Sequence, residues 1–172
     1  MKHKKLRKAL KIMAIILAVL MVLAVAALYN GLVSRTYNVK SEKLTNDEPI
    51  RIVVLADLHS YTHGEDRAPL IRRVEKMQPD LICLVGDMAD HYWPIEGTQL
   101  LLDGITNLAP CTYVTGNHEH WGDIVFFLSV FEDAGVTILR NESMKMEIKS
   151  QPLVIYGVDD TDYTRPSDHG QF

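Results

Sequence analysis

The segment Ile52-Val53-Val54-Leu55-Ala56-Asp57-Leu58-His59 decides the fold, because an apolar run stops there on a carboxylate and an imidazole. Two further segments have the same design: Leu81-Ile82-Cys83-Leu84-Val85-Gly86-Asp87, with Asp90 beyond it, and Tyr113-Val114-Thr115-Gly116-Asn117-His118-Glu119. Continuous apolar runs are typical of strands buried on both faces of a parallel sheet. Ligands of open α/β sheets bind outside the carboxyl ends of such strands. The sequence therefore predicts one shared site of Asp, His and Asn side chains.

Amphipathic helical patterns separate these strands and indicate an α/β fold. The expected helices are residues 68–77, a helix marked by Leu100, Leu101, Ile105 and Leu108, and a helix over Ile124, Phe127, Leu128 and Phe131 that Gly135 closes. The expected strands are residues 50–56, 81–85, 111–115 and 136–139. Such βαβα alternation implies parallel strands with right-handed crossovers.

Two segments outside this alternation are predicted to be strands of another kind. Residues 144–149 and 153–156 flank a Ser150-Gln151-Pro152 turn, which indicates an antiparallel pair. Residues 36–40 alternate between polar and apolar side chains, which predicts a short edge strand before the domain.

The N-terminus has the composition of a membrane anchor. Six basic residues up to Lys11 precede an uncharged run over residues 12–29, close to the roughly 20 apolar residues that cross a bilayer as a helix. Because a basic flank stays in the cytoplasm, we expect a single-pass protein of the cell membrane whose following domain is extracytoplasmic. The predicted division is residues 1–11 cytoplasmic, 12–32 transmembrane, 33–49 linker and lead-in strand, and 50–172 the domain that carries the three strand ends.

Two other interpretations of the apolar run remain open. Ala24-Val25-Ala26 provides a small-x-small site, which favours a cleaved signal peptide, although the run is longer than the roughly 7 to 15 residues of an ordinary signal. A buried core helix would need polar residues on one face, and this run has none.

Charge and cysteine positions argue against nucleic-acid binding and against a disulfide. Without the six N-terminal basic residues the net charge changes from −4 to −10, and we expect no nucleic-acid binding because the phosphate backbone is bound by Lys and Arg. The two cysteines, Cys83 and Cys111, lie at different distances before their strand ends, which places them too far apart for a disulfide. We expect two buried thiols.

The ligand types at the three strand ends suit a divalent ion such as Mn²⁺, Fe²⁺ or Zn²⁺. Asp57 and His59 can point into one cavity if the strand gives way to a loop between them. Asp87 has two oxygens and can bridge two ions about 3.5 to 4 Å apart, and Asn117 can offer its amide oxygen to the second ion. His118 is then available as a proton donor to a leaving group, with Asp90 holding its imidazolium.

Each of these residues also has an ordinary structural interpretation as a cap, a turn residue or a surface group. Their joint occurrence at three successive strand ends favours the metal site. Three other nearby histidines are interpreted as solvated loop residues: His63, His91 and His120. Three nearby aromatic residues are interpreted as packing residues: Tyr92, Trp93 and Trp121. For both sets the alternative is a role in lining a substrate cleft.

The three strand ends read D-x-H at Asp57-Leu58-His59, G-D-x-x-D at Gly86-Asp87-Met88-Ala89-Asp90, and G-N-H-E at Gly116-Asn117-His118-Glu119. In this order and spacing they resemble the motifs of the calcineurin-like metallophosphoesterases. The resemblance covers residues 37–160, and Gly157-Val158-Asp159-Asp160 is similar to the next strand end in the membrane-associated bacterial branch. It implies the first part of a four-layer α/β/β/α sandwich after the N-terminal transmembrane helix.

The resemblance also implies the chemistry. Two divalent metal ions (Mn, Fe or Zn) are implied, with Asp57 and His59 binding the first, Asp87 bridging, Asn117 binding the second, and His118 paired with Asp90 assisting the leaving group. The implied activity is hydrolysis of phosphate mono- or diesters, a hydrolase and phosphodiesterase activity, at the outer face of the membrane. The expected partners are the bilayer and a phosphate ester substrate of lipid or cell-envelope origin.

One departure from the family pattern concerns the second half of the metal site. The family completes it with a later isolated His and a G-H-x-H pair, which the sequence up to Phe172 does not contain. We therefore expect an N-terminal fragment, or a frameshifted or early-terminated product, with an exposed sheet edge and apolar face. The alternative function is that of a catalytically inactive, membrane-tethered remnant with at most a binding role.

Overall fold

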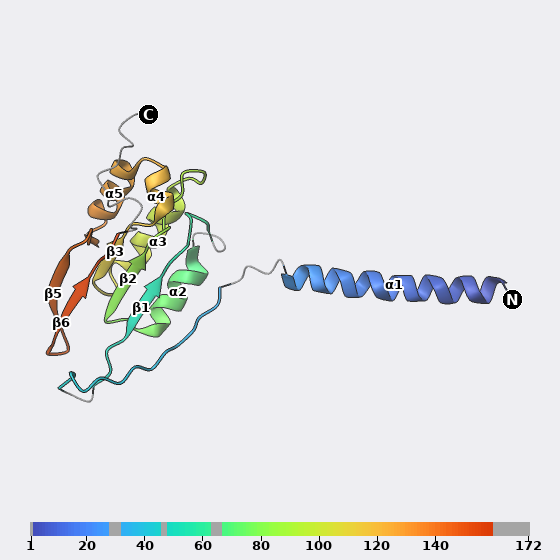
Figure 1. The fold of residues 1–172 in the computed structure, drawn as a ribbon, viewed down its shortest axis with the longest axis horizontal. Coiled ribbons are helices and arrows are strands. Elements are labelled where there is room, and N and C mark those ends of the chain that lie inside the picture. Colours follow the sequence, from blue (N-terminus) through green and yellow to red (C-terminus); the bar gives the residue numbers. More distant parts are fainter. Residues whose placement is uncertain (1, 28–31, 46–47, 63–66, 160–172) are drawn as a thin grey trace. The chain divides into compact units, whose positions relative to one another are not determined.

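The computed structural model describes residues 2–27, 32–45, 48–62 and 67–159 of the 172-residue chain. The chain divides into two compact units, Met1–Thr36 and Tyr37–Phe172 (Figure 1). Each unit has its own architecture, and the three strand ends all belong to the second.

The first unit is built around one long helix, α1 (Lys2–Ala27). Within it, Leu6–Val25 is long and apolar enough to cross a membrane, with a mean hydropathy of 2.5. The helix begins well before residue 12, so the basic N-terminal segment is helical as well. Lys, Leu and Ala are strong helix formers, which explains why the helix continues through the basic residues.

The second unit contains a four-stranded parallel sheet in the order β1-β2-β3-β4, and this confirms the expected α/β fold. Its strands are β1 (Ile52–Leu55), β2 (Leu81–Val85), β3 (Cys111–Val114) and β4 (Thr137–Ile138). The crossover helices are α2 (Ala68–Met77), α3 (Glu96–Ile105) and α5 (Ile124–Asp133), with the short α4 (Asn117–Trp121) after β3. Since all four strands are parallel, their carboxyl ends lie at one edge of the sheet.

One face of the parallel sheet packs against the helices. Paired residues of parallel strands point to the same side, so the register places Val53, Ile82, Leu84 and Tyr113 on this face, and all four are buried. Tyr113 stacks on Phe131 of α5 with ring centroids 3.8 Å apart and planes 9° from parallel. The tight packing of this face holds the strands, and so their carboxyl ends, in a fixed arrangement.

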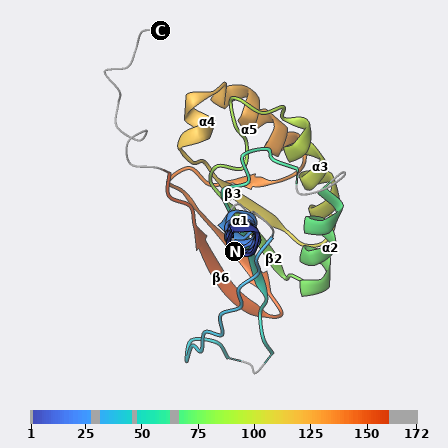
Figure 2. The ribbon, with the colours of Figure 1, turned by 90° about the vertical axis from the view of Figure 1, so that its right-hand side faces the viewer.

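The other face lies toward an antiparallel hairpin, β5 (Ser143–Ile148) and β6 (Gln151–Tyr156). Figure 2 shows this hairpin on one side of the parallel sheet and α2 and α3 on the other. The hairpin leaves part of the face open at the β1 edge, where Ile52 is 48% and Val54 is 60% exposed.

Two predictions about the second unit's periphery are wrong. Residues 36–40 form no strand, because their alternating pattern has no neighbouring strand to pair with among the described residues. The hairpin turn lies at Lys149 and Ser150 rather than at residues 150–152, since both residues have positive φ angles, 51° and 61°, as two-residue hairpin turns require. Gln151 and Pro152 belong to β6, where Pro is tolerated because the strand lies at a sheet edge.

A polar contact attaches this turn to the opposite end of the parallel sheet from the strand-end residues. The Lys149 ammonium donates to the Pro49 carbonyl at 2.8 Å and to Asp80 Oδ2 at 2.9 Å. The same Asp80 oxygen accepts a hydrogen bond from the Arg51 backbone N–H at 2.7 Å. The hairpin is thus held to the segments that begin β1 and β2.

The helix ends follow local chemistry. Pro69 lies in the first turn of α2, where a missing N–H costs nothing, and Gln78 ends the helix in the left-handed conformation with Pro79 next. Asp123 caps α5 by accepting a hydrogen bond from the Phe126 N–H at 3.1 Å. The helix predicted to reach Leu108 ends earlier, at Ile105, and Leu108 continues as a turn.

Candidate metal centre

Backbone hydrogen bonds tie the loops after β1, β2 and β3 to one another. The Gly86 N–H donates to the Val114 carbonyl at 3.0 Å, which joins the second and third loops. Three further bonds join the first loop to the second: Asp57 N–H to Gly86 O at 3.2 Å, His59 N–H to Asp87 O at 2.8 Å, and Ser60 N–H to Met88 O at 3.0 Å. The strand pairing of the sheet therefore continues into the loops that carry the functional side chains.

The backbone of these loops adopts a conformation that side-chain-bearing residues rarely take. Asp57, His59 and Asp87 have φ angles of 56°, 47° and 50°. Left-handed residues of this kind persist only where the surroundings impose them, and they cluster at functional sites. Here the left-handed residues follow the strands and turn the chain into a loop. Such a loop is the condition expected from the sequence for Asp57 and His59 to share a cavity.

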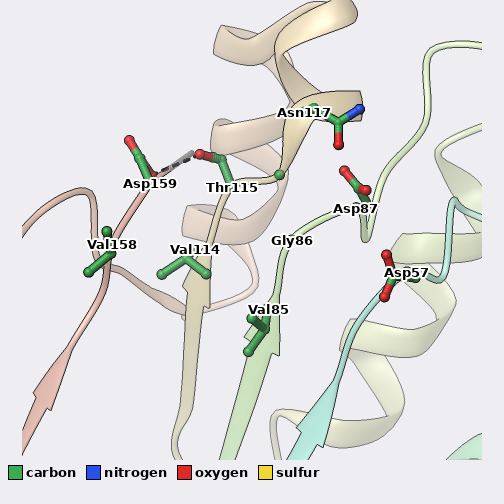
Figure 3. A pocket seen from close by; sticks show the side chains of 10 residues that line it. Asp57, Val85, Gly86, Asp87, Val114, Thr115, Asn117, Val158 and Asp159 are labelled. Atoms are coloured by element: carbon green, nitrogen blue, oxygen red, sulfur yellow. Dashed lines mark hydrogen bonds between the residues drawn. The ribbon is translucent and has the colours of Figure 1, made fainter. Parts of the chain in front are cut away.

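Asp57, His59 and Asp87 form a compact set of possible metal ligands, with one ligand atom from each within 4.8 Å of the others. Asn117, the first residue of α4, lies beside Asp87 in Figure 3, where the three neighbouring strand ends meet. A Cβ atom at Gly116 would collide with the Asp87 carboxylate and backbone N–H, so only glycine permits this approach. The structure thus brings together all four residues predicted to be metal ligands, and their roles remain predictions.

A divalent ion fits these residues. His59 Nδ1 is buried and has no hydrogen-bond partner among the described residues, so this ring nitrogen is uncompensated. Carboxylate and imidazole together suit Mn²⁺, Fe²⁺ or Zn²⁺. Burial raises the pKa of the Cys111 thiol to about 11, with a smaller contribution from neighbouring Cys83, whose own pKa burial also raises. Both thiols are free, and Cys111 is buried as expected, whereas Cys83 is only half-buried. Both stay protonated at neutral pH, so neither acts as a thiolate ligand.

The pair predicted to serve the leaving group is also in contact. His118 Nδ1 lies 2.8 Å from Asp90 Oδ2, at hydrogen-bond distance. Two more imidazoles surround the same carboxylate: His59 Nδ1 is 3.2 Å from Oδ2, without hydrogen-bond geometry, and His91 Nδ1 is 3.7 Å from Oδ1. His59, Asp90 and His118 form a second possible ligand group. Because the hydrogen bond between Asp90 and His118 already occupies that group, Asp57, His59 and Asp87 make the better ion site.

Asp90 is held in its ionised form. Burial alone would raise its pKa. The Tyr92 backbone N–H, which donates to Asp90 Oδ1 at 2.7 Å, lowers the pKa instead, and so do the hydrogen bond and the charge of His118. Together with the charge of His91 these contacts hold the pKa of Asp90 below its usual value. A lowered carboxyl pKa stabilises the fold above the ordinary Asp pKa of about 4, and the stabilisation is lost only in stronger acid. Asp90 is therefore an anion at neutral pH.

Glu119 is a functional residue that sequence reasoning missed. Its fully buried carboxylate accepts four backbone hydrogen bonds, from Asp87 at 3.0 Å, Met88 at 2.7 Å, Ala89 at 3.0 Å and Gly116 at 2.9 Å. These bonds fasten the loop of Asp87 to the loop of Asn117 and His118. The fourth letter of the G-N-H-E segment was the available signal, because a carboxylate three residues after a helix N-cap commonly accepts backbone N–H groups.

Asp159, in the segment that resembles the next strand end of the family, also takes part in the site. It lies across a cavity from Asp57 (Figure 3). The cavity has a volume of about 230 Å³ and is lined by Asp57, Asp87, Asn117, Val158 and Asp159 among others. Asp159 is buried and accepts from Thr115 Oγ1 at 2.8 Å, the dashed contact in Figure 3, and from Arg140 Nε at 2.7 Å. These bonds place the segment after β6 against the loop after β3.

Several interpretations of neighbouring residues need correction. Tyr92, Trp93 and Trp121 are 80%, 56% and 55% exposed, so they are not packing residues. His91 is an exposed loop residue, as expected, although its Nδ1 lies 3.7 Å from Asp90 Oδ1. His120 lies within α4 with Nε2 3.2 Å from Thr115 Oγ1, so it is not a solvated loop residue. His63 lies outside the described residues.

Replacing Glu119 tests the connection between the two loops. Glu119→Ala leaves four backbone N–H groups without their acceptor, and we expect the free energy of unfolding in urea to fall by about 3 kcal/mol or more. Glu119→Gln keeps one acceptor oxygen and should lose less. Glu132→Ala, at an exposed position of α5, is the matched control and should change little. Equal losses for Glu119→Ala and Glu132→Ala would show that the four bonds contribute nothing.

Comparison with known proteins agrees with this geometry. The sequence profile of the calcineurin-like phosphoesterase family matches residues 50–169. Two Bacillus subtilis (strain 168) proteins are similar: uncharacterized protein YpbG, 26% identical over 127 residues (73% of this chain, 48% of YpbG), and uncharacterized metallophosphoesterase YkoQ, 27% identical over 129 residues (72% and 48%). A Bos taurus transmembrane protein with metallophosphoesterase domain is 30% identical over 101 residues (56% and 23%).

The chain spans about half the length of the Bacillus subtilis relatives that it matches. The family match covers more than half of this chain and includes all three strand-end loops with Asp57, Asp87 and Asn117. The protein therefore belongs to the calcineurin-like phosphoesterase family.

Proposed function

We propose that this protein is a metal-dependent phosphoesterase that hydrolyses phosphate mono- or diesters with two divalent ions. The observation that carries the proposal is the position of two groups side by side: the ligand set of Asp57, His59 and Asp87 within 4.8 Å, and the hydrogen-bonded pair of His118 and Asp90 at 2.8 Å. The His118 backbone N–H also donates to Asp87 Oδ1 at 2.9 Å, so the two groups share a fixed connection.

The protein's own residues divide the work. Asp57 and His59 would hold one ion, Asn117 the other, and Asp87 both, because the Asp87 carboxylate lies between the loop of Asp57 and His59 and the loop of Asn117. Bound divalent ions supply a water of lowered pKa and stabilise negative charge on the phosphate. The left-handed backbone of Asp57, His59 and Asp87 orients their side chains in advance, so little reorganisation is needed for binding.

His118 is the proposed proton donor to the leaving group. Its Nδ1 is engaged with Asp90, which leaves Nε2 to carry the proton that the departing alcohol requires. Asp90 is anionic and stabilises the doubly protonated imidazole by a charge-assisted hydrogen bond. Asp90 thus acts through His118 as a positioning residue.

The proposed place of action is the outer face of the membrane, on a lipid or cell-envelope phosphate ester. Support comes from α1, which is apolar enough to cross a membrane and carries six basic residues at its beginning. Relatives from Bos taurus and Danio rerio are named as transmembrane proteins with metallophosphoesterase domains.

Metal-dependent hydrolysis tests the proposed function directly. The full chain in detergent micelles with Mn²⁺ should hydrolyse p-nitrophenyl phosphate or its bis ester, and a chelator should abolish the activity. Asp87→Ala removes the bridging ligand and should lower kcat/KM more than about 100-fold. Asp103→Ala, at an exposed position of α3, is the matched control. Activity unaffected by Asp87→Ala would sink the mechanism, and absence of metal-dependent hydrolysis would favour an inactive, membrane-tethered remnant.

The role of His118 is tested by the basicity of the leaving group. p-Nitrophenolate departs without a proton, whereas phenoxide, with a parent pKa near that of tyrosine at about 10, gains from one. His118→Ala should therefore lower the rate on phenyl phosphate about 100-fold and the rate on p-nitrophenyl phosphate much less. Asp90→Asn should show the same pattern in weaker form. Equal losses on both substrates would instead mean that His118 only positions other groups.

A further inference from the structure

Aromatic and imidazole rings gather beside His118. The ring of Trp121 lies 4.6 Å from that of His118 between centroids. His91 lies 5.9 Å from His118, 6.0 Å from Trp121 and 3.8 Å from Tyr92. We call Trp121, His91 and Tyr92 the ring cluster.

The ring cluster faces solvent instead of the protein core. Trp121 is 55% and Tyr92 is 80% exposed, although large aromatic side chains gain most from burial. Exposed aromatic groups beside a catalytic site commonly mark a binding surface. The backbone that carries the cluster is held in place: the Tyr92 backbone N–H donates to Asp90 Oδ1, and Trp121 is the last residue of α4, which starts with Asn117 and His118.

The proposed proton transfer links this cluster to one part of the substrate. A proton donor must come within about 3 Å of the atom that receives the proton. The oxygen of the departing alcohol therefore lies next to His118, and the rest of that alcohol extends from there. Trp121, with its ring 4.6 Å from that of His118, lies within reach of the carbon skeleton of the alcohol.

We propose that the ring cluster is the leaving-group subsite and that it selects phosphate esters whose alcohol carries a ring with a flat apolar face. The inference rests on the proposed phosphoesterase function and adds the chemical class of its substrate. Trp121 supplies the stacking surface, with His91 and Tyr92 beside it. An aromatic ring and the apolar face of a sugar ring share this chemistry.

Binding of phosphonates tests the subsite without turnover. In benzylphosphonate and ethylphosphonate a carbon replaces the ester oxygen, so neither is hydrolysed, and only the first carries a ring. Dissociation constants would be measured by calorimetry on the full chain in detergent micelles with Mn²⁺. Stacking on Trp121 should make benzylphosphonate bind about tenfold more tightly than ethylphosphonate. A cyclohexylmethylphosphonate arm separates aromatic rings from saturated rings of the sugar type.

Variants assign the preference to the ring cluster. Trp121→Ala should remove most of the preference for benzylphosphonate, and Trp121→Phe should keep part of it. Tyr37→Ala, which removes an aromatic side chain that is 76% exposed outside the cluster, should keep all of it. An unchanged ratio in Trp121→Ala, or no preference in the unsubstituted chain, overturns the proposal, as does failure of both phosphonates to bind. Preserved preference without any hydrolysis of phenyl phosphate would contradict the proposed function alone.

Discussion

Asp87 occupies the middle of the site, and its position depends on hydrogen bonds between backbones of neighbouring loops. The first loop bonds to the second through three N–H groups, and the second bonds to the third through Gly86. The Glu119 carboxylate adds three bonds that join the second loop to the third, and a fourth, from the Gly116 N–H, within the third loop. Without these bonds, side chains of like charge would move apart, because carboxylates repel one another at such distances. The positions of the candidate ion site, of His118 and of the ring cluster all depend on these hydrogen bonds between the loops.

The parallel sheet was predictable because its signals are local. Apolar runs end at Leu55, Val85 and Val114, each within a residue or two of the expected strand end, and α2 has the expected bounds. Predictions failed where a partner strand decides the outcome. Residues 36–40 have the pattern of a strand but no strand to pair with in the part of the chain that the structure describes. Pro152 suggested a turn, yet it lies on an edge strand that tolerates it.

The candidate site was predictable to the extent that residue type reveals chemistry. Asp, His and Asn at strand ends led to the four ligand candidates, and the structure brings these residues together. The structural role of Glu119 was hidden because its partners are backbone groups, which every sequence contains. Asp159 was hidden for a related reason: its bonds to Thr115 and Arg140 join segments far apart in the sequence. The exposure of Trp121 likewise depends on where α4 lies and not on its own residue type.

A bridging role for Asp87 has a spectroscopic signature that needs no substrate. Two Mn²⁺ ions held about 3.5 to 4 Å apart by a shared carboxylate are magnetically coupled. Electron paramagnetic resonance of the full chain with two equivalents of Mn²⁺ should therefore show a coupled spectrum, and Asp87→Ala should convert it to the six-line spectrum of isolated ions. A six-line spectrum of isolated ions at every Mn²⁺ ratio, unchanged by Asp87→Ala, would contradict a two-ion site at these three strand ends.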